Sequence, residues 1–201
     1  LNNISAKYWM LSASKWKPIG TPLNSFQGIF DGGGHTVSGL YADGSDYSGL
    51  FGYVSGGTVM NTNVTDSYIE GSKDVGGIVG YNSGTVDNCI NNSVVIGTRN
   101  VGGMAGENRG TVRGCQNADV VKGSNNTGGL TGGNYGTVSG CTNTNGVTGS
   151  YYIGGITGDN ITSGVVSDSF SSGDVAGNEC VGGVAGSSQL LCIVINSRNT
   201  G

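Results

Sequence analysis

The stretch GGIVGYNSGTVDNC at residues 76–89 contains the pattern that decides the fold. Its opening block, Gly-Gly-aliphatic-x-Gly, stands at residues 76–80, 102–106, 128–132, 154–158 and 182–186, and a degenerate copy stands at 48–52. Equivalent glycines of successive copies are 26 or 28 residues apart. Self-similarity at such a period indicates a solenoid, in which each repeat stacks on the next and cannot bury its apolar residues alone.

Each repeat carries two shorter landmarks as well. One is Gly-Thr-Val, as in Gly84-Thr85-Val86, and the other is a mostly β-branched pair before a glycine, as in Val95-Ile96-Gly97. Together with the aliphatic residue of the glycine block, these landmarks predict three short strands per repeat, separated by residues that suit turns. Three strands per turn is the plan of a parallel β-helix. We therefore expect an all-β solenoid of about six coils, with about 26 residues per coil and a length of roughly 30 Å.

Residues at equivalent positions of the repeats should form columns along this solenoid. Three apolar columns are expected to point inward: Val59, Val86, Val112, Val138 and Val166; Leu50, Ile78, Met104, Leu130, Ile156 and Val184; and Ile69, Val95, Val121, Val147 and Val175. A corner column of residue types that tolerate the left-handed region comprises Asn61, Asn88, Gly114, Gly140 and Asp168. A further corner column comprises Asn82, Asn108, Asn134 and Asn160, whose side-chain amides are expected to bond to one another.

The N-terminal part of the chain follows a different pattern. We expect residues 1–40 to form a cap and opening coil, and residues 41–201 to form the stacked repeats of the same single domain. Trp16, Phe26 and Phe30 supply aromatic side chains that can cover the apolar columns at an otherwise open end. The chain begins at Leu1 without a signal peptide, and residues 196–201 still follow the repeat. We therefore expect a fragment of a longer polypeptide with further domains and repeats.

The repeats resemble a known family. Residues 76–89 are similar to the GLUG repeat of bacterial secreted and surface proteins, including repeat regions attached to IgA-type metallopeptidases and to large adhesins. The stretch FDGGGHTVSGL at residues 30–40 resembles the segment that leads into such arrays, so that the resemblance covers roughly residues 16–201. It implies a right-handed β-helix that is exported and displayed at a bacterial surface. It does not imply a catalytic activity, because nothing in this segment resembles the peptidase part of such proteins.

Composition and charge argue against several classes of partner. A net charge of -4 leaves no basic face for a phosphate backbone, so we expect no nucleic-acid binding. No run of eighteen apolar residues is present, so we expect no membrane insertion. Gly32-Gly33-Gly34 lacks the Lys-Ser/Thr pair of a phosphate-binding loop, and we predict no nucleotide or other cofactor.

The sequence offers little for catalysis. His35 is the only histidine, and its place after three glycines fits a turn residue better than a general base or metal ligand. Dispersed carboxylates stand at Asp66, Asp87, Asp119, Asp168 and Asp174, and no acidic cluster is evident beside Arg99, Arg109, Arg113 or Lys122. A glycosidase needs two neighbouring carboxyl groups. We predict no catalytic or metal site, with a β-helix polysaccharide lyase or glycosidase as the alternative. A column of Thr58, Thr85, Thr111 and Thr137 lacks the neighbouring Thr column that an ice-binding surface would need.

The five cysteines fall into two groups. Cys89, Cys115 and Cys141 share a column that holds Ser or Thr in other repeats, which predicts small inward side chains and no tetrahedral metal set. Cys180 aligns with a turn position, and Cys192 lies in a two-residue insertion. An exported chain permits a disulfide between Cys180 and Cys192, and separate thiols are the alternative.

Tyrosines are the residues best suited to contact a partner. Tyr53 and Tyr81 share a column, and Tyr151 and Tyr152 lie in a later coil. A tyrosine on a polar β-surface can stack on a sugar or anchor an interface, and the alternative is that it covers strand edges and corners. We expect a non-catalytic extracellular or cell-surface module, adhesive or spacing in role, that contacts a host glycan or protein.

Overall fold

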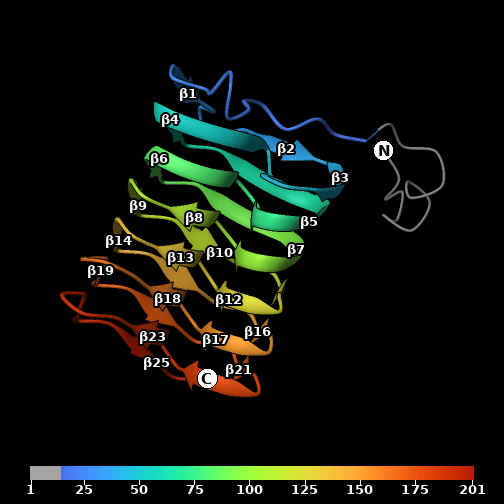
Figure 1. Ribbon diagram of the computed structural model, residues 1–201. Helices are drawn as coiled ribbons and strands as arrows, with labels where there is room; N and C mark the ends of the chain where they lie inside the picture. Colours follow the sequence, from blue (N-terminus) through green and yellow to red (C-terminus); the bar gives the residue numbers. More distant parts are fainter. Residues whose placement is uncertain (1–14) are drawn as a thin grey trace.

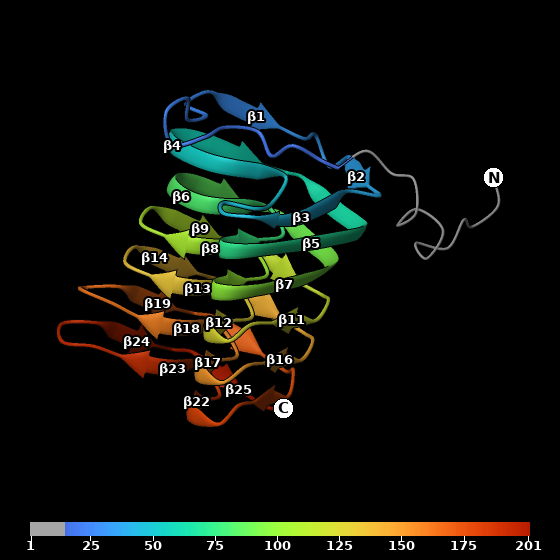
Figure 2. The ribbon, with the colours of Figure 1, turned by 45° about the vertical axis from the view of Figure 1, so that its right-hand side comes forward.

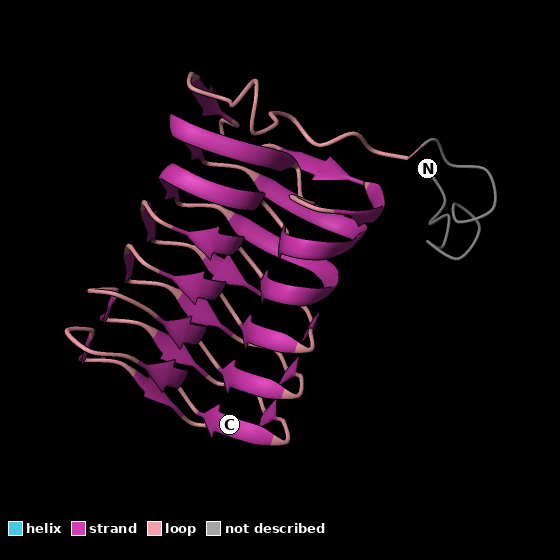
Figure 3. Cartoon of the chain, in the orientation of Figure 1, coloured by secondary structure: helices cyan, strands magenta, loops and turns pink. Residues whose placement is uncertain are grey.

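A computed structural model describes residues 15–201 of the chain, and this part contains strands but no helix. The chain winds as a parallel β-solenoid of about six coils with roughly 26 residues per coil. Figures 1 and 3 show the coils stacked on one another. Strands of successive coils pair in parallel; Val112, for example, is in register with Val86 and Val138. The predicted fold class is confirmed. Within the described residues no helix is long and apolar enough to cross a membrane.

The strands follow the coils in order. The first coil contains β1 (Ile29–Asp31), β2 (Thr36–Ser38) and β3 (Tyr41–Ser45). The next two contain long strands that bend around the solenoid: β4 (Phe51–Met60), β5 (Asn63–Gly76), β6 (Val79–Asp87) and β7 (Ile90–Gly102). A coil of short strands follows: β8 (Ala105–Asn108), β9 (Thr111–Arg113), β10 (Gln116–Asn117), β11 (Val121–Lys122) and β12 (Asn125–Gly128). The next coil has β13 (Thr131–Asn134), β14 (Thr137–Ser139), β15 (Thr142–Asn143), β16 (Val147–Thr148) and β17 (Tyr151–Gly154). The last strands are β18 (Thr157–Asn160), β19 (Val165–Ser167), β20 (Phe170–Ser171), β21 (Val175–Ala176), β22 (Glu179–Gly182), β23 (Ala185–Ser188), β24 (Ile193–Ile195) and β25 (Arg198–Asn199).

The coils that begin at β8, β13 and β18 each contain five strands, so the predicted number of three per coil is wrong. The three predicted segments are present as β8, β9 and β11 and their equivalents. The two additional strands, such as β10 and β12, are built from Gln, Asn, Thr and Gly. Apart from Thr, these residue types carry no strand signal of their own, and their backbone is held extended by pairing with the coils on both sides.

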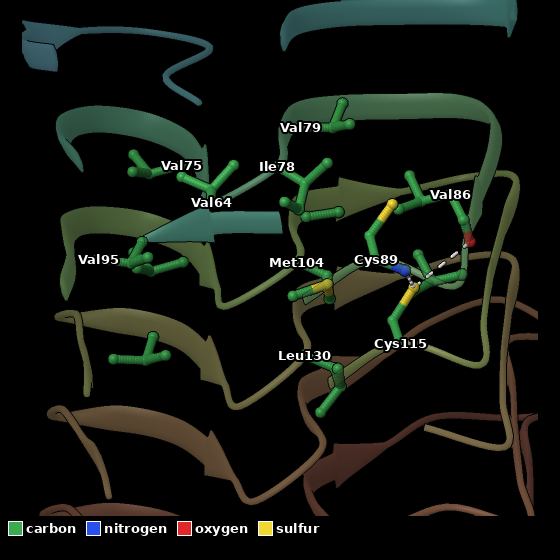
Figure 4. Packing of buried hydrophobic residues seen from close by; sticks show 14 of the residues in the cluster. Val64, Val75, Ile78, Val79, Val86, Cys89, Val95, Met104, Cys115 and Leu130 are labelled. Atoms are coloured by element: carbon green, nitrogen blue, oxygen red, sulfur yellow. Dashed lines mark hydrogen bonds between the residues drawn. The ribbon is translucent and has the colours of Figure 1, made fainter. Parts of the chain in front are cut away.

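The predicted inward columns form the core. All members of the Val112 column are fully buried, and Figure 4 shows Ile78, Met104 and Leu130 pointing into the interior one below another. Burial of such a side chain stabilises the fold by about 1.5–3 kcal/mol. At the last coil Val175 and Val184 are only partly buried. The ladders therefore supply most of the apolar surface that a glycine-rich coil can bury.

The glycines of the repeated block lie where chains approach closely. The second glycine, as at Gly103, faces the side chain of Asn117, and the third, as at Gly106, backs onto the backbone of Asp74 and Val75. A Cβ atom at either glycine would collide with these groups. Close approach, and not a positive φ angle, therefore explains this part of the motif.

Two ladders of buried asparagines run through the solenoid. In the predicted one, Asn82 Nδ2 donates to Asn108 Oδ1 at 2.8 Å, and the pattern continues to Asn134 and Asn160 at 2.8 and 2.9 Å. A second ladder, which was not predicted, joins Asn91, Asn117 and Asn143 at 2.8 and 2.9 Å. Buried amides need such partners, so both ladders fix the register between coils.

The predicted left-handed corner is also present, whereas residues 1–14 of the predicted N-terminal cap lie outside the described part of the chain. Asn61, Asn88, Gly114, Gly140 and Asp168 have φ angles from +50° to +60°. At the N-terminal end the rings of Phe26 and Phe30 pack on Phe51, with centroids 4.9 and 5.3 Å apart. In Figure 2 the loops before β19 and β24 extend beyond those of the other coils. These loops take up the extra residues of the longer repeats, and β14, β19 and β24 remain in register.

Candidate functional site

One corner of the solenoid changes composition from coil to coil. It is built by residues in the left-handed region, with φ from +51° to +60°: Tyr47, Asp74, Asn100, Asn126, Tyr152 and Cys180. We call this set the corner ladder. The turn predicted where Cys180 aligns is thus confirmed, and Tyr and Asp share the position with Asn.

A second ladder runs beside the first, one residue after the third glycine of each block. Strand pairing brings into register Tyr53, Tyr81, Glu107, Gly133, Asp159 and Ser187. We call this set the outer ladder. The third glycine lets the corner backbone lie against these strands, and Figure 1 shows β8, β13 and β18 beside β12 and β17. The two ladders together are the corner strip.

The four tyrosines predicted as contact residues lie on or next to this strip. Tyr53 and Tyr81 stack face to face, with centroids 4.2 Å apart and an interplanar angle of 11°. Burial, helped by a hydrogen bond with Tyr53, raises the pKa of Tyr81 to about 12. Tyr151 and Tyr152 are 44% and 39% exposed. Tyr151 and Tyr152 are therefore the most exposed aromatic residues on or next to the strip.

A cluster of buried polar groups occupies the middle of the strip. Asn100 Nδ2 donates to Asp74 Oδ1 at 2.7 Å and to Glu107 Oε2 at 3.1 Å. The side chain of Asp74 is fully buried, and that of Glu107 is 9% exposed. Burial raises the pKa of Asp74, and the nearby Glu107 charge acts in the same direction.

Two cations border this cluster. Lys73 Nζ lies 3.3 Å from Asp74 Oδ2, and Arg109 Nε lies 2.6 Å from Glu107 Oε1. The Arg109 guanidinium also lies over the ring of Tyr135, 4.2 Å from its centroid. The prediction that Arg109 stands beside no acidic cluster is therefore wrong. The signal that could have found the cluster is the period, because Glu107 directly follows the third glycine of its block.

The outer ladder has a gap at Gly133. A Cβ there would make only ordinary contacts, 3.4 Å from Asn100 Oδ1 and 3.8 Å from Ile161 Cδ1, so the backbone does not require glycine. In the next coil Asp159 is 6% exposed, and its Oδ2 accepts a hydrogen bond from Gln189 Nε2 at 3.0 Å. Asp159 Oδ1 has no hydrogen-bond partner, and no cation of the described residues lies within ion-pair distance of this carboxylate. The strip thus contains an acceptor with unused capacity beside a gap in its side-chain layer.

The three aligned thiols are part of the core, as predicted. The backbone N–H of Cys89 donates to Cys115 Sγ at 3.4 Å, and that of Cys115 donates to Cys141 Sγ at 3.4 Å (Figure 4 shows the first pair). Cys180 and Cys192 are free thiols, so the structure has the separate-thiol alternative and not the disulfide. Cys180 is exposed at its position on the corner ladder, whereas Cys192 Sγ donates to the Asn160 carbonyl at 3.2 Å.

The remaining candidates lie away from the strip. His35 is an exposed residue in the turn before β2. Asp87 Oδ2 forms an ion pair with Arg113 Nη2 at 2.7 Å, and Asp119 Oδ1 accepts a hydrogen bond from the backbone N–H of Val120. In residues 15–201 no group of three His, Cys, Asp or Glu side chains is placed to hold a metal ion.

Comparison with known proteins adds relatives by sequence and by fold. No protein-family model matches the chain. It is 39% identical over 79 residues to a "Putative Gly-rich membrane protein" of Evansella cellulosilytica and 38% identical over 77 residues to "Halomucin" of Haloquadratum walsbyi. Each match covers 36% of this chain, but only 9% and 1% of the two relatives.

The fold itself has a solved counterpart. The chain is similar to a "putative immunoglobulin A1 protease" from Bacteroides ovatus, with a TM-score of 0.72 and 20% identity. The match covers 94% of this chain and 65% of that one, so the chain spans less than two thirds of the proteins it matches. At this identity the likeness shows a shared β-solenoid fold.

Proposed function

We propose that this chain is a non-catalytic, extracellular repeat module of the GLUG type, which serves as an adhesive or spacing region of a bacterial surface or secreted protein. The observation that carries the proposal is the corner strip, which presents exposed aromatic rings and hydrogen-bonding groups on a regular scaffold. The names of the relatives, a membrane protein and a halomucin, and the protease whose fold it shares support a surface or secreted setting.

The polar cluster of the strip suits a structural role better than turnover. Asp74 is fully buried, and Glu107 is engaged by both Asn100 and Arg109. A general acid must reach the leaving group of its substrate. A carboxyl group without solvent access does not meet this requirement, so we assign the cluster to holding the corner of the coil.

The second candidate is a β-helix carbohydrate-active enzyme, and one observation favours it. Asp74 and Glu107 share the Asn100 amide, and burial raises the pKa of Asp74. A retaining glycosidase uses two carboxyl groups about 5–5.5 Å apart, one of them an acid with a raised pKa. The burial of Asp74 is what places this candidate second.

The test combines turnover and binding on the same preparation. The 201-residue chain is incubated with peptides and with neutral and acidic polysaccharides, and product release is followed by chromatography. The same chain, multimerised on a scaffold, is applied to a glycan array and to host cells, because weak single contacts become measurable through avidity.

We expect binding by the multimer and no product. Cleavage that is abolished by Glu107→Gln and unchanged by Asp87→Asn would contradict the non-catalytic module and support the enzyme. Absence of both binding and cleavage would leave the spacer role alone.

A further inference from the structure

The strip offers a specific ligand chemistry. Resting on the adhesive form of the proposed function, we infer that residues Asn126, Gly133, Asp159 and Tyr152 form a subsite for a neutral glycan that lies along the solenoid axis. The Asp159 carboxylate would accept hydrogen bonds from sugar hydroxyls, and the Tyr152 ring would stack against the apolar face of a neighbouring sugar unit.

Unused hydrogen-bonding capacity at Asp159 is the first support. Asp74 has Lys73 and Glu107 has Arg109, whereas Asp159 has only the Gln189 amide, on one oxygen. An acceptor that is buried without a partner is costly, by about 1–3 kcal/mol. A hydroxyl that reached Asp159 Oδ1 would supply the missing partner, and bonds to an ionised acceptor are the stronger kind.

The gap at Gly133 is the second support. Neighbouring coils carry Glu107 and Asp159 at this position, and the backbone at 133 would accept a side chain. Position 133 is itself buried, and the Asn100 amide and Ile161 Cδ1 are the side-chain groups nearest to the missing Cβ. Asp159 Oδ1 is buried in the free protein, so binding requires nearby side chains to move aside. We expect the half-buried Ile161, which belongs to the loop before β19, to be one that rotates.

The aromatic residues are the third support. Tyr152 is on the corner ladder in register with Asn126, and Tyr151 precedes it in β17. Both rings are partly exposed, whereas Tyr53 and Tyr81 turn their faces to each other. An aromatic ring beside convergent polar groups is typical of a site that fixes both the position and the orientation of a ligand.

Charge selects a neutral ligand over an acidic one. The two ladders of the strip contain three acids, Asp74, Glu107 and Asp159, and no base. The bordering cations are held by Asp74 and Glu107. A polysaccharide rich in carboxylate or sulfate would therefore meet the unpaired Asp159 charge, which is unfavourable.

The experiment measures binding of the multimerised chain to immobilised hexamers of cello-, xylo-, manno- and galacto-oligosaccharides, with polygalacturonate and heparin as acidic probes. Three variants address the subsite. Tyr152→Asn installs the residue found at Asn100 and Asn126, Asp159→Asn removes only the charge, and Gly133→Tyr fills the gap with the residue of the same ladder at Tyr81. The matched control is Tyr68→Val, which removes a ring from another ladder and installs the residue paired with it, Val94.

We expect at least one neutral oligosaccharide to bind, each subsite variant to weaken that binding at least fivefold, and the control to leave it within twofold. Thermal melting of each variant separates loss of binding from loss of fold. Neutral glycan binding that all three folded variants retain would overturn the subsite while leaving the adhesive function standing. Binding of acidic probes only, or of no glycan, would overturn the subsite, and the host-cell assay would then decide whether the adhesive function falls with it.

Discussion

The inward ladders and the corner strip are built on the same coils, yet they differ in how they use them. In the Val112 ladder the same residue returns in coil after coil, and every member is fully buried. In the corner ladder the backbone angles return just as faithfully, but the side chain changes from Tyr to Asp, Asn and Cys. Folding therefore constrains the interior residue by residue, while at the strip it constrains only the backbone. The exposed side chains of the strip, such as Tyr152 and Cys180, are available for contact with a partner.

The largest difference between interior and surface is expected when a charge is placed on each face of the same strand. Val112→Asp should abolish cooperative unfolding, because it buries an unpaired charge, and we expect a loss above about 4 kcal/mol. Thr111→Asp, next in sequence but half-buried and facing outward, should cost far less. Thermal and urea unfolding check both variants, and equal losses would contradict the assignment of inside and outside.

Thiol labelling separates the two regions without mutation. Cys89, Cys115 and Cys141 are buried, so they should resist iodoacetamide until the protein is denatured. Hydrogen bonding with the adjacent thiols and burial also raise the pKa of Cys115, which lowers its thiolate fraction. Cys180, exposed on the strip, should react in the native state. Mass spectrometry of peptides after timed labelling gives each rate, and fast native labelling of Cys115 would be incompatible with a buried ladder.

An intermediate effect is expected from the asparagine ladder. Asn108→Ala removes the bonds to Asn82 and Asn134 and leaves buried partners unsatisfied, which should lower the free energy of unfolding by about 1–3 kcal/mol. Asn125→Ala, at an exposed position, is the control and should be nearly neutral. Urea titration of both variants measures the difference, and a neutral Asn108→Ala would show that the ladder does not stabilise the fold.

The smallest effect is expected at Asp74, where the strip borders the core. Because burial raises its pKa in the folded state, the stability contributed by the protonated carboxyl is present below the unfolded pKa, about 3.9, and is lost as pH rises through the folded pKa. Asp74→Asn installs the residue of Asn100 and Asn126 and should be more stable than the parent chain at pH 7, with no such advantage at pH 3.5. Urea unfolding at the two pH values measures this, with the exposed Asp66→Asn as control. An advantage of the same size at both pH values would show that ionisation of Asp74 is not its cause.

The interior was predictable from sequence because identical residues at a fixed period mark a position where stacking demands one shape. Val112 and Asn108 could be assigned to their columns from this repetition alone. The strands at Gln116–Asn117 and Asn125–Gly128 could not, since their extended backbone comes from pairing with adjacent coils and not from residue preference.

The strip was only partly predictable for a related reason. Tyr53 and Tyr81 could be aligned by the period, but the contact of Asp74 with Glu107 through Asn100 depends on how a corner packs against the third glycine of a block. The single unpartnered oxygen of Asp159 depends on what surrounds it in three dimensions. A column of unlike residues gives no repeated signal, so the sequence indicated the positions of the strip without the chemistry they form.

The loops before β19 and β24 have a consequence for how such a chain changes over generations. Each accommodates the two extra residues of a 28-residue repeat outside the ladders, and the coils on both sides remain in register. A whole coil can therefore be duplicated or deleted without altering the packing of its neighbours. Each such event would move the groups of the strip apart or together by one step of about 4.8 Å. Duplication and deletion of coils would thus set the spacing between the residues that contact a ligand. Point mutations would change which side chain stands at each of these positions.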